Sequence, residues 1–304
     1  MKKYAIGVDI GGTKIAIGVV NELGHVIDSV SIPTNVMIPP ENVIHDINQQ
    51  IKNILIENKL KEDEVIGIGV GAPGPLDSKA GMITCPPNLP LWRDLPIKKL
   101  IENAFSIPVL IENDANAAAL AEKWIGDGQA CDHFIYMTIS TGIGSGIITE
   151  GKLLRGKKGN AGDIGHMVVN PTYGVCTCGQ EGCLEWIASG TAIARIGSEI
   201  MEEKKTTEEI FKLYNEGQDK IVPYINDVFK SIGQATVTLI NTFDTEKIII
   251  GGGVSQIGDT LIKPIQTYIN HFALNPEGRK VKVVQSHLGS NNGVIGAAAL
   301  WLNQ

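Results

Sequence analysis

The sequence predicts an α/β protein made of two related domains. Its 304 residues are enough for two domains of ordinary size, and 43% apolar residues with 35 glycines is typical of globular α/β structure. A unit of β-type run, glycine-rich turn and second β-type run occurs near the N-terminus and recurs about 129 positions later, over residues 135–149. A repeated unit of this kind indicates two domains of similar design.

The first copy of this unit opens an antiparallel meander. Its three β-type runs are Tyr4–Asp9, Ile15–Asn21 and His25–Thr34. The first turn reads D-I-G-G-T-K over residues 9–14, in which glycines let the backbone approach a ligand and point N–H groups at an anion. Thr13 and Lys14 add a hydroxyl donor and a cation. A plain hairpin turn is the alternative interpretation.

The second copy favours a phosphate site over a plain turn in both places. It carries T-G-I-G-S-G at 141–146, whereas no Walker A motif and no G-x-G-x-x-G dinucleotide motif occurs in the chain. A third glycine cluster at 251–253 ends a buried-type strand and can admit the nucleoside end of a ligand. The predicted nucleotide-binding residues are Asp9, Gly11, Gly12, Thr13, Lys14, Thr141, Gly142, Gly144 and Gly252.

Between the two hairpins the sequence predicts scaffolding that leads to ligand-binding loops. Residues 41–60 have the apolar spacing of an amphipathic helix. The strand Val65–Gly71 runs into G-A-P-G-P, at the carboxyl end where α/β sheets place ligand contacts. In the next loop Asn88 and Trp92 can bind a sugar, although Trp92 can equally be a core anchor.

The segment E-N-D-A-N at 112–116 is more polar than a helix start requires. It follows a strand at 108–111 and precedes an alanine-rich helix that runs through Trp124. Capping of the helix N-terminus is the ordinary explanation for Asp114. Capping needs one polar group, and this segment has four in five residues. Asp114 is therefore a candidate catalytic residue.

Three thiols and one imidazole predict a structural zinc site. Cys176, Cys178 and Cys183 are spaced C-x-C-x4-C, and His166 lies ten residues upstream. Three thiolates and one imidazole form a closed tetrahedral zinc set with no open position for catalysis. Unconnected thiols are the alternative, but the intervening glycines suit a chain that wraps round an ion. Asp163 and Glu185 flank this cluster and are candidates for a polar ligand pocket.

The remainder of the chain predicts helices and a late strand. The helices cover residues 186–201, 206–216 and 219–243, the strand covers 281–286, and a glycine- and alanine-rich helix starts at Asn291. The domain boundary is predicted near Asp114. Residues 1–115 then form the N-terminal α/β domain with a returning helix at 290–304, and residues 116–289 form a larger domain that carries the zinc.

Composition excludes several classes of partner. The net charge is −7 and no long basic run occurs, which argues against nucleic acid. No apolar span approaches transmembrane length, so no membrane partner is expected. Lys2 and Lys3 resemble the start of a signal peptide, but Asp9 interrupts the apolar stretch that follows. Five cysteines, three of them in one site, and no export signal predict a cytoplasmic protein.

The motifs above occur in the order seen in the ROK family of repressors, open reading frames and sugar kinases. They are D-I-G-G-T-K, G-A-P-G-P, E-N-D-A-N, G-x-A-G-D-I-G-H at 159–166 and C-x-C-G-x-x-G-C-L-E at 176–185. The chain resembles that family over nearly its whole length. The resemblance implies a two-domain actin/hexokinase-like (RNase H-like) ATPase fold, with a hexose and ATP in the cleft between the domains.

The same resemblance implies roles for individual residues. Asp114 matches the base that takes the proton of the sugar 6-hydroxyl, and a Mg²⁺ ion near Asp9 with Lys14 would neutralise the phosphates. His166 can give one ring nitrogen to zinc and keep the other for the sugar. The residues expected to hold the sugar are Gly74, Asn88, Asn113, Asp114, Asp163, His166 and Glu185. Relatives in the family are commonly homodimers, so a homodimer is expected.

The sugar itself stays open at this point. Glucokinases match the pattern best, including E-K-W-x-G at 122–126, which makes glucose phosphorylation to glucose 6-phosphate the first expectation. The family usually has glutamate where this chain has Asp163, which draws the carboxylate back by about 1.5 Å. Kinases for N-acetylmannosamine, fructose, mannose, allose or β-glucosides are the alternatives.

Two further classes share the fold. Sugar-responsive, non-enzymatic ROK repressors add a DNA-binding segment before the first hairpin, and only eight residues precede Asp9 here. An actin- or chaperone-type ATPase would share the hairpins but has no need of the zinc cluster or of E-N-D-A-N. Release of ADP that depends on added sugar separates a kinase from both.

Overall fold

The computed structural model describes residues 3–302 and divides the chain into two units. The chain passes from one unit to the other after Ala130, Lys152, Gly162 and His287. The short segment Leu153–Gly162 therefore belongs to the first unit although its neighbours in sequence belong to the second.

The first unit is built on a five-stranded sheet in the order β3-β2-β1-β4-β7. β1, β2 and β3 form the predicted antiparallel meander, and β4 and β7 add to β1 in parallel. The strands span Tyr4–Ile10 (β1), Lys14–Asn21 (β2), Val26–Pro33 (β3), Val65–Ala72 (β4) and Val109–Asn113 (β7). The carboxyl ends of β1, β4 and β7 thus lie at one edge of the sheet.

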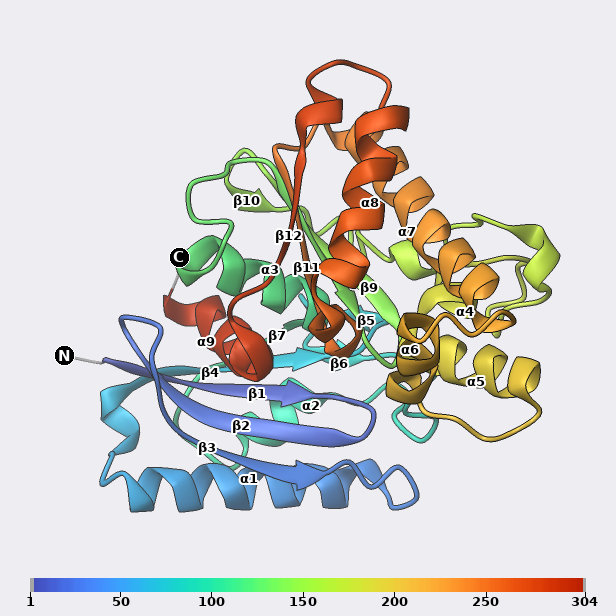
Figure 1. Cartoon of the computed structure of the whole chain (residues 1–304). Helices are drawn as coiled ribbons and strands as arrows, with labels where there is room; N and C mark the ends of the chain where they lie inside the picture. The colour runs from blue at the N-terminus through green and yellow to red at the C-terminus, as the bar shows by residue number, and fades with distance from the viewer. Residues whose placement is uncertain (1–2, 303–304) are drawn as a thin grey trace. The chain divides into compact units, whose positions relative to one another are not determined.

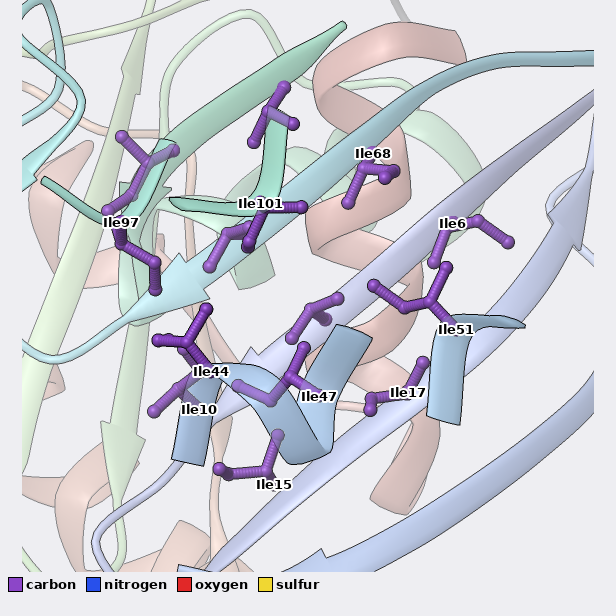
Figure 2. Packing of buried hydrophobic residues seen from close by; sticks show 14 of the residues in the cluster. Ile6, Ile10, Ile15, Ile17, Ile44, Ile47, Ile51, Ile68, Ile97 and Ile101 are labelled. Atoms are coloured by element: carbon purple, nitrogen blue, oxygen red, sulfur yellow. The ribbon is translucent and has the colours of Figure 1, made fainter. Parts of the chain in front are cut away.

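One face of this sheet is covered by α1 (Pro40–Glu57) and α2 (Ile97–Glu102), which bury an isoleucine-rich core (Figure 2). Ile44, Ile47 and Ile51 of α1 recur at helical spacing and are fully or almost fully buried. Trp92 is 0% exposed and belongs to the same core. Of its two interpretations, the core anchor is therefore the one that holds.

The other face is covered by α9 (Asn292–Leu302) and α3 (Asp114–Ile125), which pack on each other (Figure 1). The backbone of α9 lies directly on β1 and β4. A Cβ atom on Gly7 would overlap the Val294 carbonyl, and one on Gly69 would overlap the Ala297 carbonyl. Glycines in these strands are what allow so close an approach.

The first unit runs on past the predicted boundary between residues 115 and 116, because α3 packs on α9. α3 lies in the first unit, which continues to Ala130, and the returning C-terminal helix lies there too. A tight contact between two alanine-rich helices leaves no sign in local sequence, so the boundary could not be read there.

The second unit repeats the design of the first in a sheet of order β10-β9-β8-β11-β12. β8 and β9 form the antiparallel hairpin, and β11 and β12 add in parallel. The strands span Phe134–Ile139 (β8), Ile143–Thr149 (β9), Lys152–Leu153 (β10), Lys247–Gly251 (β11) and Lys282–Gln285 (β12). The repeat predicted from the two glycine turns is thus present as two sheets of matching strand order.

The helices of the second unit follow the prediction with one correction. They span Leu184–Ala188 (α4), Gly190–Met201 (α5), Thr207–Asn215 (α6), Ile221–Phe243 (α7) and Asp259–Phe272 (α8). The single helix expected at 186–201 is broken at Ser189, which has extended backbone and caps α5 through the Ala192 amide. Gly190 donates its amide to Ser140 at 2.7 Å, which fixes the break against the β8–β9 turn.

Smaller elements complete the chain. A two-stranded hairpin joins Leu76–Asp77 (β5) to Met82–Ile83 (β6), and short 3-10 turns lie at Glu62–Glu64, Ile164–His166, Pro171–Tyr173, Gly253–Ile257, Gly278–Lys280 and Gly289–Asn291. Within residues 3–302, none of the helices combines the length and the apolar character that a bilayer crossing needs.

Candidate functional site

Two hydrogen bonds to Gly11 hold the first glycine turn in place. Gly11 donates its amide to the Lys14 carbonyl at 2.9 Å, and the Thr34 hydroxyl at the end of β3 donates to the Gly11 carbonyl at 2.7 Å. Thr13 and Lys14 are exposed, so their hydroxyl and ammonium groups are accessible to an anion. Asn88, expected on the sugar, lies beside this turn, with its Cβ 3.7 Å from where a Cβ of Gly12 would stand.

Asp9 stands at the carboxyl end of β1 next to this turn. Burial raises the pKa of the Asp9 carboxyl to about 6, although the nearby Lys14 ammonium acts in the opposite direction. A Cβ on Gly293, at the start of α9, would overlap the carboxylate, so glycine there leaves it room. A partly buried carboxylate beside accessible amides is an oxygen donor of the kind that Mg²⁺ binds.

The carboxyl end of β7 carries Asn113 and Asp114. The helix cap is Asn113, whose Oδ1 accepts from the amides of Ala115 and Asn116 at 3.0 and 3.2 Å. Asp114 is the first residue of α3, and its Oδ1 accepts from the Ala115 amide at 2.8 Å. Because Asn113 caps the helix, capping does not account for Asp114.

The G-A-P-G-P loop lies beside this pair of residues. It ends β4, which pairs with β7, and a Cβ on Gly74 would stand 3.4 Å from Asn113 Nδ2 and 3.6 Å from Asn160 Oδ1. The structure therefore brings together Gly74, Asn113 and Asp114 from the predicted sugar set, within the first unit.

The second glycine turn is held by Glu185. Ile143 donates its amide to Glu185 Oε2 at 2.7 Å, and a Cβ on Gly142 would overlap that same carboxylate. Gly252, with φ of 85°, packs on the end of β8, where a Cβ would lie 2.5 Å from the Ile139 carbonyl oxygen. Glu185, expected on the sugar, thus also binds the turn expected to hold phosphate.

The four predicted zinc ligands form one cluster in the second unit. One ligand atom from each of His166, Cys176, Cys178 and Cys183 lies within 4.8 Å of the others. Cys176 Sγ is 3.7 Å from His166 Nδ1, and Cys178 Sγ is 3.6 Å from Cys183 Sγ. Zinc–sulfur bonds of about 2.3 Å in a tetrahedron separate neighbouring ligand atoms by roughly 3.5–3.8 Å. The set fits a tetrahedral zinc ion, and His166 faces it with Nδ1.

The chain wraps tightly round this cluster. Gly174, Gly179 and Gly182 all have positive φ, as the glycine content of the segment predicted. Burial raises the pKa of the Cys183 thiol to about 12, whereas the Gln180 amide lowers the pKa of Cys178 to about 7. A thiol that burial keeps protonated needs a cation to become a ligand, and a divalent metal supplies that charge.

Asp163 is close in sequence to this cluster, and its side chain does not cap the turn that follows it. It precedes the 3-10 turn Ile164–His166, its side chain caps nothing, and the residue is exposed. The carboxylate is therefore accessible, three residues before the predicted zinc ligand His166.

Sequence reasoning missed the roles of Arg155 and Asn160 in the segment Leu153–Gly162. Arg155 Nε donates to the buried Glu112 at 2.8 Å, and Asn160 bonds Leu76 through both its amide atoms at 3.0 and 2.9 Å. These groups lie about 40 and 80 positions apart in sequence. No local sequence pattern predicts hydrogen bonds between residues so far apart. The four polar groups in E-N-D-A-N did predict a candidate catalytic residue in that segment.

Metal removal tests the zinc cluster. We expect Cys178→Ser to lose the ion and to lower the melting temperature, because three of four ligands bind zinc far more weakly. Plasma emission spectrometry and thermal unfolding measure both. Cys85→Ser, which changes an exposed free thiol outside the cluster, is the matched control. Wild-type protein free of zinc and indifferent to chelators would contradict the site.

The raised pKa of Asp9 gives a prediction for stability against pH. The native carboxyl binds its proton more tightly than the unfolded one, whose pKa is about 3.8, so the stability present at low pH declines as pH rises toward about 6. We expect Asp9→Asn to remove this decline and to be more stable than wild type above pH 6 without added metal. Melting temperatures from pH 4 to 8 measure it.

Asp77 is the control of opposite sign for this measurement. The Ala80 amide and Lys158 hold the pKa of Asp77 below its usual value, so Asp77→Asn should lose stability at neutral pH rather than gain it. A pH profile of Asp9→Asn parallel to that of wild type would show that the pKa of the Asp9 carboxyl is not raised in the folded protein.

Comparisons of sequence and structure with known proteins identify a family for this chain. The sequence profile of the ROK family matches residues 5–304. A glucokinase of Halalkalibacterium halodurans is 36% identical, over 99% of this chain and 94% of its own length. The N-acetylmannosamine kinase of Haemophilus influenzae is 31% identical, over 96% and 93%.

A solved structure shares the fold as well. The crystal structure of a ROK family glucokinase from Streptomyces griseus, in complex with glucose and AMPPNP, aligns with a TM-score of 0.83 at 32% identity. The alignment covers 99% of this chain and 100% of that one. The match of the family profile over residues 5–304 and a relative 36% identical over 99% of this chain show that the chain belongs to the ROK family.

Proposed function

We propose that this protein is an ATP-dependent hexose kinase, with glucose as the first candidate substrate and glucose 6-phosphate as its product. The observation that carries the proposal is Asp114: a carboxylate at the start of α3 and the end of β7, beside a residue that already caps the helix. Relatives that are glucokinases, at 36% identity, support the choice of sugar.

In this proposal Asp114 is the general base. It needs to lie within about 3 Å of one sugar hydroxyl to accept its proton as the phosphoryl group is transferred. Asn113 Nδ2 and the Gly74 backbone lie next to it and would orient the sugar. The family resemblance also assigns Asp163, Glu185 and His166 to the sugar. For His166 the contact would be made by the Nε2 atom, since Nδ1 faces the cysteines.

Phosphoryl transfer depends on charge neutralisation and alignment. The amides of the two glycine turns, with Thr13, Lys14 and Thr141, would hold the phosphates of ATP. Asp9 would hold Mg²⁺, which supplies charge neutralisation on the phosphates when bound. His166, Cys176, Cys178 and Cys183 would hold a zinc ion in a structural role, because four protein ligands would leave no open position for substrate or water.

A second candidate substrate is N-acetylmannosamine, which the Haemophilus influenzae relative is named for. Asp163 is where the choice would be made, because it is shorter than the glutamate usual in the family. A cytoplasmic location remains part of the proposal on the cysteine content and the absence of an export signal. A homodimer remains part of it on the family resemblance.

The base is tested by Asp114→Asn. We expect turnover to fall by roughly 10²-fold or more, because the amide cannot accept the proton. Stability should change little, since Asn113 keeps the cap. ADP release coupled to glucose addition measures turnover, and thermal unfolding checks the fold. Near-normal turnover in a folded variant would remove Asp114 from the chemistry.

Selectivity is tested by Asp163→Glu across glucose, mannose, 2-deoxyglucose and N-acetylmannosamine. Unpaired polar groups discriminate more strongly than lost methylenes, so the ratios of kcat/KM among these sugars should change more than the KM for ATP. A shift of all four sugars by one common factor would mean that Asp163 does not read the sugar.

A further inference from the structure

A buried carboxylate stands one residue before the proposed sugar-binding pair. Glu112 is the second-to-last residue of β7 and is 1% exposed. Its Oε1 accepts from the Asn113 amide at 3.0 Å and from Asn116 Nδ2 at 3.1 Å. Its Oε2 accepts from Arg155 Nε at 2.8 Å. Both oxygens are thus satisfied, as burial of a carboxylate requires.

These bonds fix the peptide that leads into the proposed base. The Asn113 amide lies in the peptide unit between Glu112 and Asn113. The orientation of this unit determines where the Asn113 side chain points and where α3 begins. Asn116 Nδ2, in that same turn, is shared between Glu112 and the Gly159 carbonyl, the latter at 3.3 Å. One carboxylate therefore holds both ends of the short stretch that contains Asp114.

Arg155 brings a second segment to the same carboxylate. The segment Leu153–Gly162 folds back on Arg155, whose carbonyl accepts from the amides of Gly159 and Ala161 at 3.1 and 3.3 Å. Asn160 fastens it to Leu76 with two hydrogen bonds. The segment ends where the next residue in the chain is Asp163, the proposed selectivity residue.

We propose that Glu112 and Arg155 are positioning residues that hold Asn113 and Asp114 for phosphoryl transfer. This rests on the proposed function of Asp114 as the base. Neither residue is required to touch substrate. Without Arg155, Glu112 Oε2 loses the donor at 2.8 Å, and a buried carboxylate with one oxygen unpaired reorients toward water. The Asn113 amide then loses its acceptor, and a displacement of about 1 Å at a catalytic group can cost on the order of 10²-fold in rate.

A tether that only stabilises the fold is the competing explanation, and the chain offers a matched control for it. Lys158 Nζ lies 3.2 Å from Asp77 Oδ2, so a second ion pair ties the same segment to the same unit. That pair ends on Asp77 of β5 and not on Glu112. A pure tether would make the two pairs equivalent in kinetics.

The experiment compares Arg155→Met, Arg155→Lys and Lys158→Met. We expect Arg155→Met to lower kcat/KM for glucose by roughly 10- to 100-fold while the KM for ATP changes by less than about twofold. Arg155→Lys, which keeps a cationic donor, should recover most of the loss. Lys158→Met should leave kcat unchanged. Glu112→Gln keeps an oxygen for the Asn113 amide but turns an NH2 donor toward Arg155 Nε. It should also lower kcat/KM for glucose with the KM for ATP little changed, and it serves if Arg155→Met does not fold.

Two results overturn the inference. Equal kinetic effects of Arg155→Met and Lys158→Met, or a change in melting temperature with normal kinetics, would reduce the pair to a tether. The activity of the wild-type protein in the same assay distinguishes failure of the positioning role from failure of the proposed kinase function. An active wild type with an active Arg155→Met removes only the positioning role, whereas a wild type that phosphorylates no hexose removes the proposed function and the inference together.

Discussion

The first unit depends on the contact between the backbone of α9 and the strands β1 and β4. Val294 and Ala297 place their carbonyls where Gly7 and Gly69 have no side chain. That contact brings the last helix of the chain onto the first strand, and it carries the start of α9 to Asp9 through Gly293. The position of the expected Mg²⁺ ligand is thus set by helix–sheet packing.

Much of this arrangement could be predicted from sequence. The two strand–turn–strand units, the parallel strands with ligand loops at their carboxyl ends and the cysteine–histidine cluster each have a local signature of spacing and residue type. His166 and the three cysteines meet because the intervening glycines permit positive φ, which composition reveals. The core role of Trp92 was left open because an aromatic ring suits a sugar as well as a core.

The rest could not be predicted, for physical reasons that differ from case to case. The break at Ser189 depends on a hydrogen bond from Gly190 to the distant Ser140. The membership of α3 in the first unit depends on small side chains packing across two helices. The pairing of Glu112 with Arg155 joins residues that only the folded chain brings together. Long-range contacts of this kind override local helix propensity, and no local sequence pattern predicts them.

The placement of α9 also has a consequence for how the protein is made. A chain that emerges from the ribosome N-terminus first exposes the apolar strip of Ala5 and Val20 long before Val294 and Ala298 exist to cover it. The sheet of the first unit cannot be sealed until the second unit has been synthesised, since α9 follows β12 in the chain. Contacts of such long range fold slowly and leave apolar surface open to aggregation in the meantime.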